Sequence, residues 1–244
     1  MEKSEKLDRF LSEVQDKLAH KDFFQQSIAP LSTIFLYQEQ CAYILNYIDR
    51  SVPFQKGVQE MLGYTPDEFT FDFVLNNYHP DDIQIVQRVL KAALQYNIEN
   101  DVKNNTLFKL CYRIRKKNGD YIKVLRNSST FELNKEGNMV SNLSTLTDIS
   151  FLNMGNKVEW YFESAGLDRS RFRSLVKKSF EAYFSERQLE IIRLLAAGNS
   201  SHSIANLLSI SKHTVDTHRR AMLKKANCVN TIELLNFCLN NGIK

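Results

Sequence analysis

Residues 196–220 read AAGNSSHSIANLLSISKHTVDTHRR, and this stretch decides the fold of the C-terminal part of the chain. Gly198 is typical of the residue that closes a helix, because glycine adopts positive φ without a Cβ clash. Ser200 and Ser211 are each typical of a residue that caps the start of a helix. The stretch therefore predicts two short helices joined by a tight turn at 209–211, the second one basic. This helix-turn-helix pattern indicates double-stranded DNA as the partner.

The basic helix divides into an inward and an outward face. Val215, His218 and Met222 recur at spacings of three and four, so we expect them to face the core. The first turn favours phosphate through its amides and dipole, and the outer face reaches base edges in the major groove. The alternative for each polar residue, taken singly, is ordinary solvation. The candidate DNA-contacting residues are Lys212, His213, Thr214, Asp216, Thr217, Arg219, Arg220 and Lys224.

The excess positive charge is localised. The chain has 32 Lys and Arg residues and 28 Asp and Glu residues, and residues 184–244 hold 8 and 4 of them. Residues 1–183 therefore hold 24 of each kind, so the net charge of +4 falls entirely in the last 61 residues. Such localisation favours binding to a phosphate backbone through counterion release.

Residues 184–236 resemble the LuxR-type C-terminal DNA-binding domain. The resemblance implies four helices, with the third in the major groove and a fourth, at about 231–240, that commonly supports dimer formation. The position after Thr-Val is often Lys or Arg in that family, and here it is Asp216, which makes Arg220 the stronger candidate for base contact. A carboxylate accepts from a cytosine amino group but repels phosphate. The matching residues include Ser185, Arg187, Gly198, Ser200, Ile204, Ala205, Ile210, Ser211, Thr214, Val215, His218 and Lys225; Ser185 and Gln188 also form a capping-box pattern.

Residues 28–150 alternate between strand and helix signals. The fold class that we predict is α+β, with five antiparallel strands and helices inserted between the second and the third, followed by an all-α four-helix domain. The Asn118-Gly119 pair is typical of the turn in a β-hairpin. The expected strands are 34–37, 41–48, 108–115, 121–133 and 140–149. The expected helices are 52–62, one starting at Thr65, and one capped by Asp81 or Asp82.

Four phrases in this region resemble a PAS domain: MLGYTPDEF at 61–69, HPDD at 79–82, YRIRKKNGDY at 112–121 and TDI at 147–149. The resemblance implies a sensor or dimerisation module with a pocket between the sheet and its helices. The helix after Gly63 lacks the Cys of photoactive flavin domains, and the helix at 82–96 lacks a His for haem. We therefore predict neither cofactor, and leave open an unidentified small molecule in the pocket.

The expected domain limits are an N-terminal amphipathic helix in 1–27, the PAS domain in 28–150, a connector with a helix in 151–183 and the LuxR-type domain in 184–244. Leu7, Leu11, Val14 and Leu18 form an apolar seam on a helix over 4–26. That helix either caps the next domain or makes a dimer contact. His79 is expected to satisfy a loop. The basic residues at 113–117 are interpreted as a solvated strand end, with a second nucleic-acid contact as the alternative.

Other classes of protein are disfavoured by what the sequence lacks. No window approaches 18 uninterrupted apolar residues, and the N-terminus has no secretory pattern. The four cysteines form no Cys-x-x-Cys pair, and no nucleophile–base set or phosphate loop is evident, so we predict neither a metal site nor an enzyme. The prediction is a cytoplasmic bacterial transcription regulator that binds DNA as a homodimer, with RNA polymerase as a further candidate partner and no membrane partner. The alternative is a ligand-binding or interaction module whose C-terminal domain docks protein.

Overall fold

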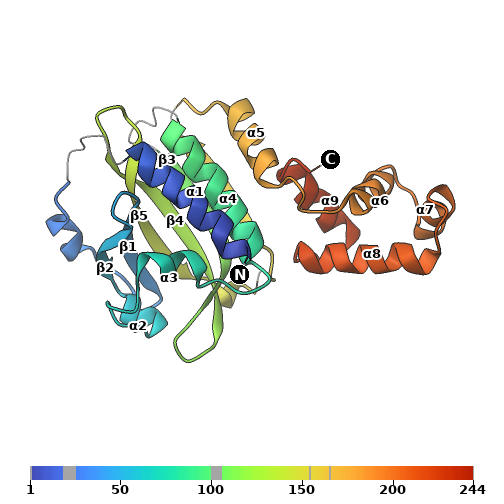
Figure 1. The fold of residues 1–244 in the computed structure, drawn as a ribbon. Coiled ribbons are helices and arrows are strands. Elements are labelled where there is room, and N and C mark those ends of the chain that lie inside the picture. The colour runs from blue at the N-terminus through green and yellow to red at the C-terminus, as the bar shows by residue number, and fades with distance from the viewer. Residues whose placement is uncertain (1, 19–25, 100–105, 154, 165, 244) are drawn as a thin grey trace. The chain divides into compact units, whose positions relative to one another are not determined.

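The computed structural model describes residues 2–18, 26–99, 106–153, 155–164 and 166–243 (Figure 1). It divides into two compact units, Met1–Asp168 and Arg169–Lys244. The division falls inside the connector that was expected at 151–183. No helix in the described part of the chain is long and apolar enough to cross a membrane.

An antiparallel sheet forms the centre of the N-terminal unit. Among the described residues it has six strands in the order β2-β1-β5-β4-β3-β6, whereas the sequence predicted five. The sixth comes from the expected connector and pairs with β3, and Phe162 in it is buried. The strands are β1 (Gln40–Asn46), β2 (Ser51–Lys56), β3 (Thr106–Arg115), β4 (Tyr121–Leu133), β5 (Met139–Asp148) and β6 (Glu159–Ser164).

The first hairpin lies later in the chain than predicted. Residues 34–37 lie outside the strands, and β1 pairs instead with β2, in a segment that was expected to be helical. Only Val58–Leu62 of that segment forms a helix, α2. Gly57 explains the break: its φ is 76°, and a Cβ there would come within 2.5 Å of the Gln40 carbonyl oxygen. The apolar spacing of 52–62 continues across this glycine, so periodicity alone predicted one helix.

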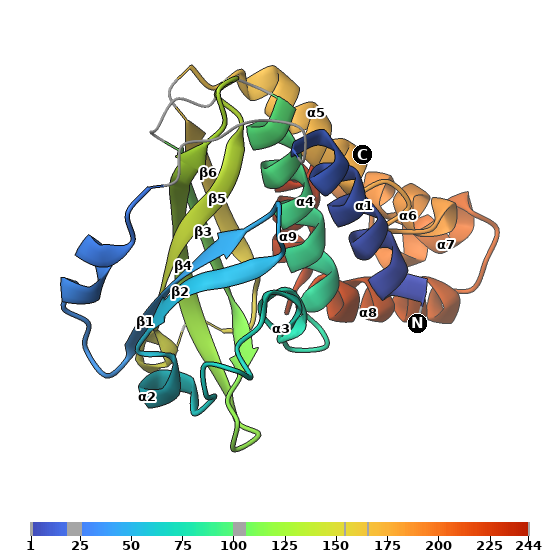
Figure 2. The same cartoon turned by 60° about the vertical axis from the view of Figure 1, so that its left-hand side comes forward.

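Helices cover one face of the sheet (Figure 2). Helix α4 (Ile83–Glu99) packs on β3 and β5, and α1 (Glu2–Leu18) packs on α4. Leu11, Val14 and Leu18 of the expected seam are buried. The helix therefore caps the PAS domain, which was one of its two expected roles. The side chain of Leu7 and residues 19–25, which the prediction included, lie outside the described part.

The helix expected at Thr65 begins later. The Thr65 amide and hydroxyl both donate to the Glu68 carboxylate, at 2.9 and 3.0 Å, and close a turn. Helix α3 (Phe71–Asn76) starts only after Thr70, whose hydroxyl accepts from the Phe73 amide. The Thr-x-x-Glu pattern is thus a local turn here, although it matches a helix-start signature.

A buried ion pair joins α4 to β3. The Asp82 carboxylate is 0% exposed and accepts from the Arg113 amide at 2.8 Å, from Nε at 3.1 Å and from Nη2 at 2.5 Å. The Arg113 side chain is 12% exposed, so its interpretation as a solvated strand end was wrong. Nearby, His79 Nδ1 accepts from the Asp81 amide at 3.1 Å, which confirms the loop role expected for His79.

The C-terminal unit is helical. Tyr183, Phe184 and Phe180 meet Phe237 in one aromatic cluster at its centre. The four helices that the resemblance implied are all present, and α5 precedes them. The helices are α5 (Arg169–Ser179), α6 (Glu186–Ala196), α7 (Ser201–Leu207), α8 (Lys212–Lys225) and α9 (Thr231–Asn240).

We predict that Asp82→Ala lowers the free energy of unfolding of the N-terminal unit by roughly 3–5 kcal/mol, because it leaves the Arg113 guanidinium buried without its counter-charge. Trp160 is the single tryptophan and lies in β6, so urea unfolding followed by its fluorescence reports on this unit. The control is Asp81→Ala, the half-exposed neighbour at 3.9 Å from Arg113, which should cost less than about 1 kcal/mol. Equal losses in the two variants would contradict the prediction.

Candidate nucleic-acid interface

Three serine caps fix where the helices of the C-terminal unit begin. Ser185 and Gln188 form the predicted capping box at the start of α6. The hydroxyl of Ser200 accepts from the Ser203 amide at 3.1 Å, and that of Ser211 from the Thr214 amide at 3.0 Å. Each cap satisfies an amide that the first helical turn leaves without a partner. The predicted starts of α6, α7 and α8 are confirmed.

The turn between α7 and α8 is held by backbone geometry and one arginine. Ser209 adopts a φ of 53°, and the Ile210 amide donates to the Ala205 carbonyl at 3.0 Å. The Arg187 guanidinium reaches from α6 to the Leu208 carbonyl at 2.9 Å and pairs with Glu190 at 2.7 Å. These contacts fix the angle at which α8 leaves α7.

Helix α8 has one buried face and one exposed stripe. Val215 and Met222 are buried, as predicted, and His218 is half-buried. The exposed stripe is formed by His213, Thr217, Arg220 and Lys224, which follow one another at spacings of four, three and four residues. Residues at these spacings lie on one side of a helix. The structure thus brings four of the eight candidate residues into one line.

Asp216 forms ion pairs inside the domain. Its carboxylate lies 3.2 Å from Lys212 Nζ and 3.9 Å from Arg219 Nη1. Hydrogen bonding to the Ser201 hydroxyl, and then to Lys212, holds the pKa of the Asp216 carboxyl below its usual range. The carboxylate is therefore ionised at neutral pH and paired with Lys212 and Arg219. Thr214, the remaining candidate of the first turn, is half-buried and contacts the Ser211 hydroxyl at 2.9 Å.

Arg219 joins three helices. Its Nη1 donates to the Ser201 hydroxyl at the start of α7, and its Nη2 donates to the Thr231 hydroxyl at the start of α9, at 2.9 Å. Lys225 is also used internally: its ammonium donates to the Tyr183 carbonyl and lies 4.7 Å from the centre of the Tyr183 ring. Arg219 is one of the candidate DNA-contacting residues, and its guanidinium is engaged inside the domain. A helical wheel does not show which side chains another helix engages.

Helix α5 carries basic residues that the sequence analysis left out. All five are exposed, and α5 contains no acidic residue: they are Arg169, Arg171, Arg173, Lys177 and Lys178. Counted by structural unit, residues 169–244 hold 13 Lys and Arg against 5 Asp and Glu, and residues 1–168 hold 19 against 23. The units therefore carry net charges of +8 and −4. A charge count that ended at residue 183 placed α5 with the acidic unit and hid this contrast.

Comparison with known proteins agrees with both resemblances. Residues 182–238 match the family of bacterial regulatory proteins described as the luxR family, and residues 52–146 match the PAS fold. The chain thus contains a PAS domain followed by a LuxR-family helix-turn-helix domain. This class comprises regulatory proteins and not enzymes.

Each of the following relatives matches only a part of this chain. The uncharacterized response regulatory protein YgeK of Escherichia coli (strain K12) is 35% identical over 83 residues, which are 34% of this chain and 55% of that protein. Regulatory protein SdiA of the same strain is 40% identical over 63 residues, 26% of each chain. These matches span about a quarter to about half of the length of the two curated relatives. A structure of the Vibrio cholerae VqmA dimer without target DNA is 14% identical, with a TM-score of 0.36 over 90% of this chain and 89% of that one.

We predict that Arg219→Ala destabilises the C-terminal unit by roughly 1–3 kcal/mol, because two hydrogen bonds from a charged donor are lost. Hydrogen–deuterium exchange on the full chain would show faster exchange at the starts of α7 and α9. The matched control is Arg220→Ala, whose exposed side chain donates to Asp216 and Thr217 of its own helix, both at 3.4 Å. Unchanged exchange in Arg219→Ala would show that the hydrogen bonds of Arg219 to Ser201 and Thr231 contribute nothing to stability.

Proposed function

We propose that this chain is a bacterial transcription regulator in which the PAS unit senses a small molecule or a partner and the LuxR-family unit binds double-stranded DNA. The exposed stripe on α8 is the observation that carries the proposal. On one side of a capped helix, Arg220 and Lys224 supply two cations. Thr217 and His213 add a hydroxyl and an imidazole. Side chains of these types bind base edges and phosphates in the major groove.

The proposed roles of the eight candidate residues follow from their contacts. Arg220 and Thr217, exposed at the middle of the stripe, are assigned to base edges. Lys224 is assigned to phosphate, as are the first-turn residues Lys212, His213 and Thr214, where the helix dipole favours an anion.

Asp216 and Arg219 are assigned positioning roles, because their charged groups face each other and Ser201. This differs from the expectation that Asp216 accepts from a cytosine amino group. That contact would require the carboxylate to give up its pairing with Lys212 at 3.2 Å. In the proposed arrangement Asp216 instead holds Lys212 and Arg219 in place while Arg220 reads the base.

The homodimer is proposed to form through α9. Ile232 and Leu239, one heptad apart, are 72% and 78% exposed, and Val229 just before the helix is also exposed. Large apolar side chains that gather on one exposed surface mark an interaction site. A two-fold dimer presents two copies of α8 to half-sites about one turn of DNA apart, which explains why dimer formation and specific binding belong together.

The same proposal places the protein in the cytoplasm, because its DNA partner lies there. RNA polymerase is proposed as a further partner, since a regulator bound near a promoter acts on transcription through the polymerase. The support for both is the luxR-family match of the C-terminal unit. No membrane partner is proposed.

We predict that Arg220→Ala lowers the preference for specific DNA by roughly 5- to 150-fold, because one bidentate base contact is worth about 1–3 kcal/mol. Lys224→Ala should weaken binding to specific and random duplexes equally and reduce the salt slope by about one. The specific duplex would be selected from a random library with the full chain, and affinities measured by fluorescence anisotropy over a series of salt concentrations.

The control for this experiment is Lys109→Ala, an exposed lysine on β3 of the PAS unit, which should leave both affinities unchanged. If the C-terminal unit docks protein instead, it should show no salt-dependent binding to random duplex, because it makes no phosphate contacts. That result would reject the proposed DNA interface.

We predict that Ile232→Asp shifts the protein from dimer to monomer in sedimentation equilibrium, because a charge replaces an apolar side chain in the proposed interface. Affinity for a two-fold DNA site should fall with it. Leu207→Asp is the matched control for oligomeric state: Leu207 is also an exposed apolar residue, but lies on α7. Dimers of equal stability in both variants would place the interface elsewhere.

A further inference from the structure

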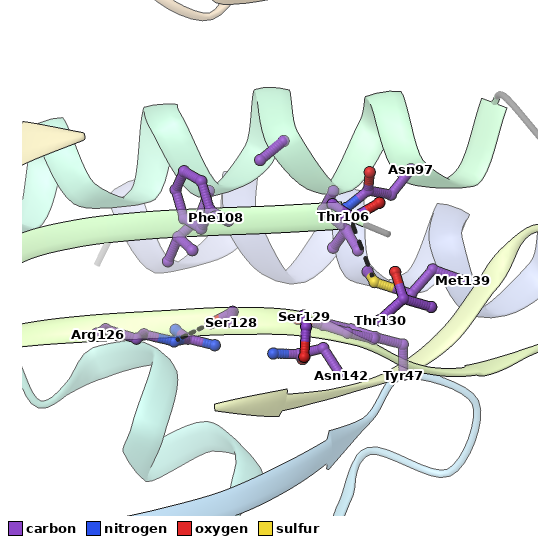
Figure 3. Close-up of a pocket in the computed structure, with 13 residues that line it drawn as sticks. Tyr47, Asn97, Thr106, Phe108, Arg126, Ser128, Ser129, Thr130, Met139 and Asn142 are labelled. Carbon is purple, nitrogen blue, oxygen red and sulfur yellow. Dashed lines mark hydrogen bonds between the residues drawn. The ribbon is translucent and has the colours of Figure 1, made fainter. Parts of the chain in front are cut away.

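A cavity lies between helix α4 and strands β4 and β5 of the PAS unit (Figure 3). It contains about 360 Å³ of atom-free space, including the part that opens toward solvent. Leu90 and Leu94 of α4 line it with apolar carbon, and Arg126, Thr130 and Asn142 line it with polar groups. A mostly apolar wall with a few converging polar groups is typical of a small-molecule site.

Arg126 is the unusual member of this lining. Its side chain is 1% exposed, which makes it the largest fully buried side chain among the described residues. Its Nε donates to the hydroxyls of Ser128 and Ser144, at 2.9 and 3.1 Å, and its guanidinium carbon lies 5.5 Å from the centre of the Tyr43 ring. Its Nη1 has no hydrogen-bond partner in the described part of the chain. Among the residues that the structure describes, no carboxylate forms an ion pair with it.

The phenols around Arg126 do not supply the missing negative charge. Burial raises the pKa of Tyr47 to about 12 and raises that of Tyr43 above its ordinary value. Both side chains are therefore neutral at physiological pH, and so is Tyr112, whose pKa burial raises further. An arginine stays protonated under these conditions. In the described part of the unit only neutral groups surround this buried cation, which is strongly unfavourable without an anion.

Three further polar atoms of the cavity lining lack a partner among the residues that the structure describes. They are Asn97 Oδ1, Thr130 Oγ1 and Asn142 Oδ1. The amide nitrogen of Asn142 donates to Ser144 at 2.8 Å, which directs its oxygen away from that hydroxyl. Buried polar groups are almost always hydrogen-bonded, so several orphans around one cavity indicate a ligand that carries matching donors. The occupant should therefore have both an anionic oxygen and a hydroxyl or amino donor.

We propose that the PAS unit binds a small organic acid, with Arg126 pairing to its carboxylate and at least one of Asn97, Thr130 and Asn142 bonded to a hydroxyl or amino group of the same molecule. This inference rests on the proposed function, because it names the chemical class that the sensor recognises. The contrast with Arg113 supports it. Arg113 also lies in the sheet, and Asp82 neutralises it within the protein. Arg126 lines the cavity, and its Nη1 has no partner among the described residues.

Glycolate is the probe for this proposal, because it is a very small molecule that holds a carboxylate and a hydroxyl. Glycolamide is its neutral counterpart of nearly equal size. Isothermal titration calorimetry on the full chain, at constant ionic strength set with chloride, should give at least about tenfold tighter binding of glycolate, since a hydrogen bond to a charged group is lost with the amide. Arg126→Met should abolish that difference.

The control variant is Arg115→Met, an exposed arginine at the end of the neighbouring strand β3, which should leave the preference for glycolate intact. If Arg126→Met fails to fold, Asn142→Leu replaces it and should weaken glycolate more than acetate, which lacks the hydroxyl. Equal binding of glycolate and glycolamide, no binding of either, or a preference that survives Arg126→Met would each overturn the proposal. Phosphate binding as tightly as glycolate would overturn the organic-acid class.

A DNA titration without any probe separates this inference from the proposed function. A chain that prefers glycolate but binds no DNA keeps the acid site and contradicts the transcription regulator. A chain that binds DNA but does not distinguish glycolate from glycolamide keeps the regulator and contradicts the acid site.

Discussion

The hydrogen bonds of Arg219 are the constraint on which the C-terminal unit depends. One guanidinium ties α8 to the first residues of α7 and α9, and Asp216 adds a charge on the same side. Hydrogen bonds from a charged donor are worth about 1.5–3 kcal/mol each, so this single side chain fixes the helix that the proposed function places in DNA. Because Arg219 turns toward the domain, its neighbour Arg220 turns away from it, and the exposed stripe is left for a partner.

Some arginines in the described part of the chain pair with a carboxylate, and Arg126 does not. The two kinds have different proposed roles. Arg113, Arg187 and Arg219 have protein partners and hold elements together. Arg126 has only hydroxyls and rings, and the price of burying it is left to a ligand in the proposed site. Stability alone would favour an apolar residue at such a position, because an uncompensated buried charge is costly. A retained cost of this kind is typical of a binding site.

Local patterns predicted the C-terminal unit well and the PAS unit less well. Serine caps, Gly198 and the apolar spacing of α8 act within a few residues, so the helix starts could be predicted from the sequence. The β1–β2 pairing depends on contact between strands and on Gly57 approaching Gln40, and neither follows from periodicity. The roles of Asp82, Arg113 and Arg219 could not be predicted for the same reason, since their partners lie 12 to 31 residues away in the chain. The strand β6 was missed because an edge strand of six residues leaves only two buried side chains as a signal.

On α4, a residue of the cavity lining lies next to one that contacts the end of the N-terminal unit. Asn97, which lines the cavity, directly follows Tyr96 on α4. The hydroxyl of Tyr96 accepts from the amide of Asp168 at 2.9 Å, and Asp168 is the last residue before the unit boundary. Asn97 and Tyr96 thus share one turn of α4, with the first at the cavity and the second bonded to the end of the N-terminal unit. Coupling requires that this hydrogen bond have two states whose balance the ligand changes, because a ligand that binds both states equally shifts nothing. The Tyr96–Asp168 hydrogen bond, inside the N-terminal unit, is where such a two-state change would have to appear.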